Sequence, residues 1–466
     1  MTERFDLVVV GAGPAGEKAG AQAAYFGKRV AIVDRSPEPG GNAASRTGVP
    51  TKTLREAALY LTGFGRREVY GLGIELDRET VLDRMHARTA EVVKLSVEAV
   101  RRNIERHGIE LIQGEARVTS DHEVLVEGAE GRRRLRGEVV LLATGSRPFH
   151  PPGISFDDPD VHDSESILSI RKIPDRLLVV GRGPVGCEYA SIFLALGAEV
   201  TLIDRGDTLL PFADEEISGE FTKILERRGM RFAFGLTVTS VERRAGGLRV
   251  GLSSGEILEP GAVLFASGRS GSTEGLGLED AGIEVDDRGR IVVDPTFRTS
   301  AETVYAAGDV IGPPALASVS MEQGRVAVCQ AFSIPFKDMV DPLPPFGVYA
   351  IPEVAMVGMT ETEARSAGID AECGRASFDG NARARISGAT DGLVKLVFRR
   401  GDRTLLGVHI VGDDATELVA IGQAVVHQGG TIDQFINTTF NVPTRSEAFK
   451  YAAYDGLQNE SGHSGP

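Results

Sequence analysis

Two of the short apolar runs along the chain lead directly into a glycine-rich loop. Residues 7–10, Leu-Val-Val-Val, precede the loop at 11–16, and residues 177–180, Leu-Leu-Val-Val, precede the loop at 181–186. An uninterrupted apolar run of this length is typical of a strand that is buried on both faces of a parallel sheet. The residues that follow each loop favour a helix. The pattern therefore predicts two strand–loop–helix units in an α/β protein.

A second apolar run follows each unit and ends at an acidic residue. Residues 30–33 lead to Asp34 and residues 200–203 lead to Asp204, at the same distance from the first glycine of each loop. G-x-G-x-x-G followed by an acid roughly 20 residues later is typical of a dinucleotide-binding βαβ unit. The glycines allow a tight turn and close approach of a pyrophosphate, the helix amino end faces the phosphates, and the acid accepts ribose hydroxyls. We expect two such sites, built on Gly11, Gly13, Gly16 and Asp34 in one copy and Gly181, Gly183, Gly186 and Asp204 in the other.

Three further segments look like strand ends. Residues 140–148 (Val-Leu-Leu-Ala-Thr-Gly-Ser-Arg-Pro) and 263–269 (Val-Leu-Phe-Ala-Ser-Gly-Arg) are alike, and we interpret them as the exits of two homologous modules. Residues 303–310 form a short apolar run that ends in Gly308-Asp309. That turn is expected at the carboxyl edge of a sheet, where ligands of doubly wound folds bind.

Composition restricts the function. The chain has 466 residues, a formal charge of −15 and 42% apolar residues, which indicates an ordered multidomain protein. The negative charge would repel nucleic acid and anionic lipid, so neither is expected as a partner. The first residues lack the long apolar stretch of a signal peptide, and no run approaches the ~20 residues of a membrane-spanning helix. We expect a cytoplasmic protein.

The cysteines favour neither a metal site nor a disulfide framework. Only Cys187, Cys329 and Cys373 occur, and they are far apart. Zinc sites and disulfide scaffolds require closely spaced or numerous cysteines. Each cysteine is interpreted as a small buried apolar residue, and no metal is expected.

The order of these motifs resembles that of the dihydrolipoamide dehydrogenase and glutathione reductase family of flavoproteins. The resemblance runs from GAGPAG through ATGSRP and GRGPVGCEYA to YAAGDV, and extends to residues 349–358 and 443–447. It implies an α/β fold with two Rossmann-like dinucleotide-binding domains, one for FAD and one for NAD(P), plus a C-terminal α+β dimerisation domain. The implied domains are FAD-binding over 1–150, NAD(P)-binding over 151–271, a return segment to the FAD domain over 272–341, and dimerisation over 342–466. Strands near 393–398 and 405–411 and a helix near 415–427 suit the last of these.

The resemblance also assigns site residues. Lys52 would lie beside the flavin N5, paired with Glu188, and these two are the candidate catalytic residues. Asp309 would bind the ribityl chain, and the Ala317 backbone N–H would face the flavin pyrimidine edge. The implied FAD-binding residues are Gly11, Gly13, Pro14, Ala15, Gly16, Asp34, Arg35, Gly41, Asn42, Lys52, Ala116, Thr144, Gly145, Asp309 and Ala317. The implied NAD(P)-binding residues are Gly181, Gly183, Gly186, Glu188, Asp204, Arg205 and Gly268.

Two departures from the family pattern bear on the reaction. The reductases of the family carry a cysteine pair in Gly-Gly-x-Cys-x-x-x-x-Cys-x-Pro-x-Lys, whereas Ala43 and Gly48 stand at those positions here. Near the C-terminus Val442 replaces the histidine that acts as acid and base. Neither a thiolate nor a proton-transferring group is therefore available for disulfide chemistry.

The expected reaction is hydride transfer from NADPH to NAD, or the reverse, through FAD. Residues 145–150, 163–169, 186–193 and 435–444 most resemble the family members that exchange hydride between these two nucleotides. Asp204 suits the ribose hydroxyls of NAD and Arg205 suits the 2′-phosphate of NADP, although Arg205 pointing to solvent in an NAD-selective enzyme is the alternative. The alternative functions are an NAD(P)H oxidoreductase with a quinone or other small acceptor, and a flavin-bound regulatory or structural subunit without turnover. A homodimer is expected, and a higher oligomer stays open.

Overall fold

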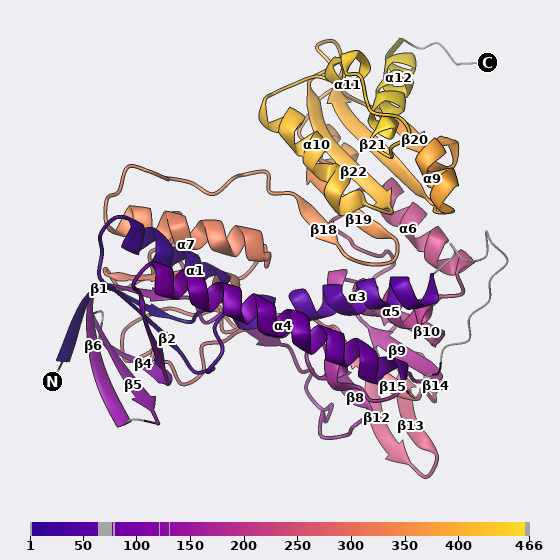
Figure 1. The fold of residues 1–466 in the computed structure, drawn as a ribbon. Helices are drawn as coiled ribbons and strands as arrows, with labels where there is room; N and C mark the ends of the chain where they lie inside the picture. Colours follow the sequence, from indigo (N-terminus) through magenta and orange to yellow (C-terminus); the bar gives the residue numbers. More distant parts are fainter. Residues whose placement is uncertain (1, 64–76, 78–79, 121, 130, 462–466) are drawn as a thin grey trace. The chain divides into compact units, whose positions relative to one another are not determined.

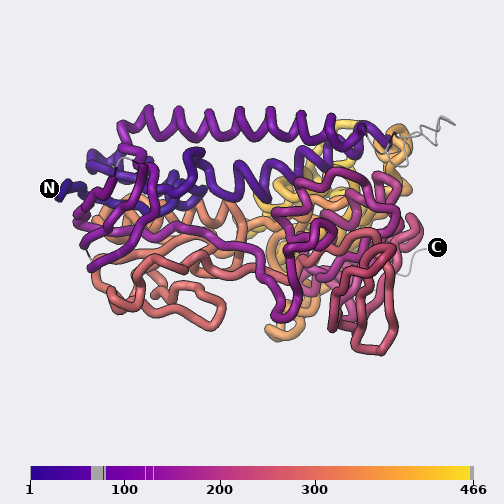
Figure 2. The backbone as a smooth tube through the Cα atoms, turned by 90° about the horizontal axis from the view of Figure 1, so that it is seen from below, coloured from indigo at the N-terminus to yellow at the C-terminus, as the bar shows by residue number. Residues whose placement is uncertain are grey.

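The computed structural model describes residues 2–63, 77, 80–120, 122–129 and 131–461. The chain forms two compact units. The first consists of residues 1–53, 86–149 and 268–342, and the second of residues 54–85, 150–267 and 343–466. Helices α3 (Val49–Thr62) and α4 (Val81–Arg106) contain two of the boundaries, and Figure 2 shows α4 as an uninterrupted series of turns.

The first unit is built on a sheet in the order β3-β2-β1-β6-β5-β4, with β17 paired to β6. Strands β3, β2, β1, β6 and β17 run parallel, and β4 and β5 add an antiparallel extension. Helices α1 and α7 pack against each other in this unit (Figure 1). The strands are β1 Thr2–Val10, β2 Val30–Asp34, β3 Glu110–Gln113, β4 Glu115–Ser120, β5 Glu123–Gly128, β6 Gly131–Leu142, β7 Ser146–Pro148, β16 Arg269–Gly271 and β17 Val304–Ala306. The helices are α1 Pro14–Tyr25, α2 Gly41–Ser45, α7 Ala317–Ala331 and the 3-10 turn η3 Asp309–Ile311.

The amino-terminal part of the second unit repeats this plan. Its parallel sheet has the order β11-β10-β9-β15-β8, so β10 and β15 flank β9 as β2 and β6 flank β1. The strands β12, β13 and β14 form a separate antiparallel sheet. The elements are β8 Val161–Asp163, η2 Ser166–Ser169, β9 Arg176–Val180, α5 Pro184–Ala195, β10 Glu199–Asp204, α6 Glu215–Arg227, β11 Arg231–Phe234, β12 Val238–Arg244, β13 Gly247–Leu252, β14 Ile257–Leu258 and β15 Ala262–Phe265.

The C-terminal part of the second unit is an antiparallel sheet in the order β18-β19-β22-β21-β20. Helix α10 packs on β19 and β22, and α12 packs on β20 and β21 (Figure 1). The elements are β18 Phe346–Val348, β19 Glu353–Gly358, α8 Glu361–Ser366, β20 Ala371–Ser377, η4 Phe378–Gly380, α9 Ala382–Ser387, β21 Gly392–Arg399, β22 Leu405–Gly412, α10 Ala415–His427, α11 Asp433–Asn437 and α12 Glu447–Ser461.

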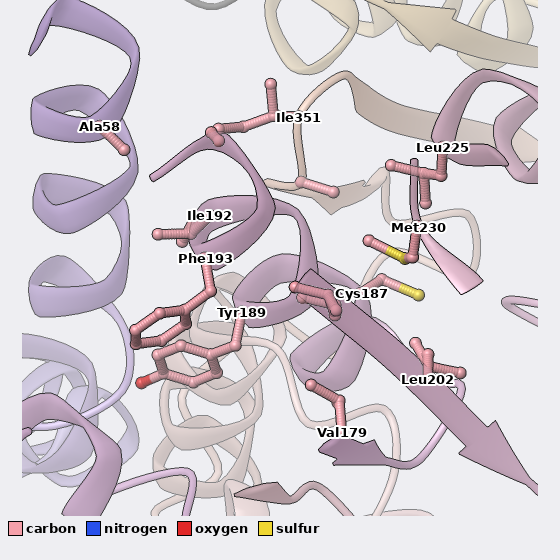
Figure 3. Packing of buried hydrophobic residues seen from close by; sticks show 14 of the residues in the cluster. Ala58, Val179, Cys187, Tyr189, Ile192, Phe193, Leu202, Leu225, Met230 and Ile351 are labelled. Carbon is pink, nitrogen blue, oxygen red and sulfur yellow. The ribbon is translucent and has the colours of Figure 1, made fainter. Parts of the chain in front are cut away.

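The predicted α/β fold with two Rossmann-like modules and a C-terminal α+β domain is confirmed. Each predicted strand before a glycine loop is a fully paired inner strand, and residues 7–9 have no exposed surface. In the second unit one apolar core joins α3, α5, β9, β10 and α6. Figure 3 shows Ala58 of α3 and Phe193 of α5 within this core. Pairing on both sides fixes the carboxyl ends of β1 and β9, where the two glycine loops begin.

Candidate functional site

The first glycine loop closes against the end of β6. Gly11 has a φ of +109°, and a Cβ on it would lie 2.3 Å from the carbonyl oxygen of Ala143. Helix α1 then begins at Pro14, whose missing N–H costs nothing at a first helical position. Gly41 approaches Gly13 closely in space. A Cβ on Gly41 would lie 2.9 Å from the Gly13 Cα. The helix amino end is thus lined by backbone alone, which suits a phosphate.

Asp34 is held at the end of β2 beside this loop. Its Oδ2 accepts a hydrogen bond of 2.7 Å from the Ala12 N–H, and its Oδ1 accepts one of 2.8 Å from the Ser36 N–H. Two backbone donors fix the carboxylate in one orientation while leaving further lone pairs for a ligand hydroxyl. This orientation leaves the ribose-binding role of Asp34 possible, and that role stays a prediction.

Ser146 joins the other predicted residues of the first unit. Its Oγ donates to Asp309 Oδ2 at 3.0 Å, and its carbonyl oxygen accepts from Asn42 Nδ2 at 2.7 Å. Arg269 donates to both oxygens of Ser146 at 2.7 Å. The Thr144 hydroxyl nearby is buried and has no hydrogen-bond partner among the described residues. A buried hydroxyl without a partner is costly, and a polar ligand group would satisfy it.

The remaining predicted FAD residues occupy varied positions. Ala15 and Gly16 are buried in the first turn of α1, and Gly145 is half-buried after β6. Ala317 is the exposed first residue of α7 and Ala116 is half-buried on β4. Arg35 is exposed after β2, and Lys52 is half-buried on α3. The structure therefore gathers Gly11, Gly13, Asp34, Gly41, Asn42 and Asp309 in one region of the first unit. Ala116 pairs with Val126 of β5, and Arg35 is an exposed residue after Asp34.

Ala43 and Gly48, the positions of the missing cysteine pair, touch each other. A Cβ on Gly48 would lie 2.3 Å from the Ala43 carbonyl oxygen and 2.8 Å from its Cα. The loop is therefore closed too tightly for a side chain at position 48 unless the backbone moves. The chain has no thiol at either position, and at position 48 it also has no space for a side chain. Its three cysteines are buried and free, and burial raises the pKa of the Cys187 thiol.

The second glycine loop closes against the end of β15 as the first closes against β6. Gly181 has a φ of +124°, and a Cβ on it would lie 2.4 Å from the Ala266 carbonyl oxygen. Helix α5 starts at Pro184, as α1 starts at Pro14. Asp204 accepts from the Arg182 N–H at 3.2 Å and from the Gly206 N–H at 2.8 Å. The predicted residues Gly181, Gly183, Gly186 and Asp204 thus form one cradle.

Three other predicted residues have positions that differ from those of the loop glycines. Arg205 is exposed, while Gly268 belongs to the first unit and accepts a hydrogen bond from the Phe149 N–H at 3.0 Å. Glu188 is buried on α5, and its Oε1 accepts a hydrogen bond of 2.9 Å from the Tyr349 N–H. Sequence reasoning missed Arg182, whose side chain reaches the Asp204 carboxylate. Only its contrast with Ala12 of the first loop could have drawn attention to it.

Among the described residues of the C-terminal part, neither Val442 nor His427 takes the place of the histidine of the reductases. Val442 is 65% exposed, and His427 is exposed at the end of α10. In the described part of the chain, no group of acidic, histidine and cysteine residues could hold a metal ion. No described helix combines the length and apolar character needed to cross a bilayer.

Comparison with known protein families shows which family the chain belongs to. The profile of the pyridine nucleotide-disulphide oxidoreductase family matches residues 5–324, and that of the family's dimerisation domain matches residues 344–453. The chain belongs to the pyridine nucleotide-disulphide oxidoreductase family. The resemblance that the sequence motifs suggested is therefore confirmed.

Relatives in this family share most of their length with the chain. The soluble pyridine nucleotide transhydrogenase of Mycobacterium bovis (strain BCG / Pasteur 1173P2) is 44% identical over 454 residues, which cover 97% of each chain. That of Marinomonas sp. (strain MWYL1) is 39% identical over 460 residues, covering 98% of this chain and 99% of the relative. Among solved structures, the HOCl-induced flavoprotein disulfide reductase RclA from Escherichia coli, as a Cu(II) complex, superposes with a TM-score of 0.87. It is 27% identical and covers 97% of this chain and 99% of its own. LpdA from Mycobacterium tuberculosis superposes with the same TM-score, identity and coverage.

Proposed function

We propose that this protein is an FAD-dependent transhydrogenase that moves hydride between NADPH and NAD⁺ without a redox-active disulfide. The closed loop at Ala43 and Gly48 carries the proposal, because it removes disulfide chemistry while both nucleotide cradles stay intact. The relatives that cover nearly the whole chain are named soluble pyridine nucleotide transhydrogenases, which supports the same reaction.

FAD is the cofactor that suits the first unit. The glycine-lined amino end of α1, the fixed Asp34 carboxylate and the unsatisfied Thr144 hydroxyl offer partners for a dinucleotide. Asp309, oriented by Ser146, would bind the ribityl hydroxyls. When bound, FAD would accept a hydride from one pyridine nucleotide and return it to another.

The chain's own residues would bind the nucleotides and tune the reaction. Gly181, Gly183 and Gly186 would leave room for a pyrophosphate, and Asp204 would accept a ribose hydroxyl. Glu188 is held in place by the Tyr349 N–H, so its carboxylate has a fixed orientation. Lys52 and Glu188 keep the catalytic roles that the family resemblance implies.

The first test separates nucleotide acceptors from other acceptors. Flavin in the purified protein is reduced anaerobically with NADPH and then mixed with NAD⁺ in a stopped-flow instrument. The expected result is rapid return of the oxidised flavin absorbance with one NADH formed per flavin. Reduced flavin that ignores NAD⁺ but is reoxidised by a quinone would contradict the proposal. Prior treatment with a thiol-alkylating reagent should leave the rate unchanged, because all three cysteines are buried.

The protein is also proposed to be a homodimer that assembles through its dimerisation domain. Residues 344–453 match that domain, and α12 at its end exposes two aromatic side chains. Tyr451 is 59% exposed and Tyr454 is 50% exposed. Large aromatic residues are the side chains that most often dominate the binding energy of an interface.

Introducing charge on α12 should therefore dissociate the dimer. In the double variant Tyr451→Asp/Tyr454→Asp the dissociation constant is expected to rise at least ~100-fold, since buried unpaired charges oppose association. Light scattering coupled to size exclusion should give about twice 49.6 kDa for the wild type and a value near 49.6 kDa for the variant. Tyr25→Asp, at a 76% exposed residue of α1, is the control that should stay dimeric. A dimeric double variant would place the interface elsewhere.

The cytoplasm is the proposed compartment. Free, unpaired cysteines suit a reducing environment, and all three cysteines of the chain are free.

A further inference from the structure

The two glycine loops differ at one position whose side chain reaches the ribose-binding acid. Ala12 and Arg182 are equivalent, since each donates its N–H to the acid of its own module and each accepts a backbone hydrogen bond through its carbonyl oxygen. Ala12 is buried and ends at its methyl group. Arg182 instead places a guanidinium at the end of β10, where the adenosine ribose of a dinucleotide would lie.

Several contacts hold the Arg182 side chain at that point. Its Nε lies 3.2 Å from Asp204 Oδ1, and its Nη1 donates to the Thr208 carbonyl oxygen at 3.0 Å and to the Thr208 hydroxyl at 3.3 Å. Asp207, whose side chain is 92% exposed, lies 3.8 Å away. The Arg182 side chain is 25% exposed, so the guanidinium is both held and accessible.

Gly206 provides the space that this arrangement needs. A Cβ on Gly206 would lie 2.0 Å from the Arg182 Cζ, so any side chain there would displace the guanidinium. The equivalent residue in the first module is Ser36, which donates its N–H to Asp34 as Gly206 does to Asp204. The large side chain of Arg182 is therefore accompanied by a glycine at position 206, whereas the small Ala12 is accompanied by Ser36. Only the second module has a cation beside its acid together with the space for it.

We propose that Arg182, and not the adjacent Arg205, recognises the 2′-phosphate of NADP(H). With NAD(H), the Asp204 carboxylate accepts a hydrogen bond from a ribose hydroxyl, and Arg182 stays paired with Asp204. With NADP(H), the guanidinium turns from Asp204 to the phosphate, for which its planar fork of donors is suited. The positive charge of Arg182, which stays close to both groups, also offsets the repulsion that the Asp204 carboxylate would exert on a phosphate. One site can then accept both nucleotides, which the proposed hydride exchange requires and on which this inference rests.

Binding of adenosine fragments tests the inference without turnover. Calorimetric titration of the FAD-loaded protein with 2′,5′-ADP and with 5′-AMP reports the 2′-phosphate contact directly. In Arg182→Ala the affinity for 2′,5′-ADP should fall about 10- to 100-fold, the usual effect of losing a charge-assisted hydrogen-bonded pair, while that for 5′-AMP changes less than about twofold. Arg182→Lys should restore part of the loss. Arg231→Ala removes a 75% exposed arginine at the opposite end of the sheet and should bind both fragments as the wild type does.

The outcomes separate this inference from the proposed reaction. A wild type that does not prefer 2′,5′-ADP, or an Arg182→Ala variant that keeps the preference, overturns the role of Arg182. Loss of the preference in Arg205→Ala alone would assign recognition to Arg205. If Arg182→Ala loses the preference but reduced enzyme does not transfer hydride to NAD⁺, the inference stands and the proposed reaction fails.

Discussion

Gly11→Ala should give protein that is almost free of FAD, whereas Gly181→Ala should keep FAD and lose pyridine nucleotide binding. Both glycines adopt a φ that alanine avoids, +109° at Gly11 and +124° at Gly181. A methyl group at either position would also meet a backbone carbonyl oxygen at 2.3–2.4 Å. Backbone strain alone costs on the order of 1–3 kcal/mol, and the clash forces the loop away from the phosphate site. We expect the affinity for the affected ligand to fall at least ~10-fold.

Two measurements on each variant distinguish the modules. The ratio of flavin to protein absorbance reports FAD content, and titration with NADH under anaerobic conditions reports reduction of the flavin that remains. Gly219→Ala is the matched control, because Gly219 lies on α6 and a Cβ there meets nothing within 4 Å. It should retain both ligands. A Gly11→Ala protein with full FAD content would show that the first glycine loop is not the FAD site.

The nucleotide cradles were the most predictable part of the molecule. Glycine spacing and the acids at 34 and 204 are local features, and local geometry follows from them: the same two backbone donors reach each acid. The predicted helix at 415–427 and the strands near 393–398 and 405–411 are present as α10, β21 and β22. Long apolar runs with clear boundaries leave little choice of structure.

Features that depend on side chains meeting across the fold were not predictable. Nothing in the sequence says that Arg182 lies over Gly206, because the contact joins a loop after β9 to one after β10. The substitutions at 43 and 48 were evident from the motif, but the contact between them depends on how the loop folds back. The packing of residues 54–62 of α3 into the core of the second unit also has no sequence signal. The domain bounds and the assigned roles of Lys52, Glu188, Arg35, Ala116 and Gly268 stay predictions.

A buried ion cluster in the second unit was equally invisible in the sequence. Lys395 on β21 has a side chain that is 2% exposed and is surrounded by three carboxylates. Its Nζ lies 2.7 Å from Glu361 Oε2, 2.9 Å from Asp214 Oδ1 and 3.1 Å from Glu216 Oε2. Arg375 also pairs with Glu216 at 2.7 Å. Asp214 caps α6, so the cluster fixes that helix to the C-terminal sheet.

Removing the lysine should strongly destabilise the second unit. In Lys395→Met the length of the side chain is retained, but the buried Asp214 loses the cation that lies 2.9 Å from its Oδ1. Breaking a buried ion pair from one side costs about 3–5 kcal/mol, so the apparent melting temperature should fall on the order of 10 °C. Urea unfolding followed by far-UV circular dichroism measures the change in the free energy of unfolding. Lys223→Met, at a 67% exposed lysine of α6, should change it by less than about 0.5 kcal/mol.

The pH dependence of that loss identifies its cause. For Asp214, Glu216 and Glu361 burial raises the pKa, but the hydrogen bond and charge of Lys395 oppose it in all three. Arg375 adds to this at Glu216, His409 at Asp214 and Arg365 at Glu361, and each pKa is lowered. Carboxyls with a lowered pKa in the folded state stabilise the fold above their unfolded pKa of about 4, and this stability is lost as the pH falls through the folded value. In Lys395→Met the same carboxyls can take up protons at a higher pH, which relieves the unpaired charge. The difference in unfolding free energy between variant and wild type should therefore be largest near about pH 7 and shrink towards about pH 4. If the difference in unfolding free energy stays constant over this pH range, the lost stability comes from packing around the Lys395 methylene groups and not from charge.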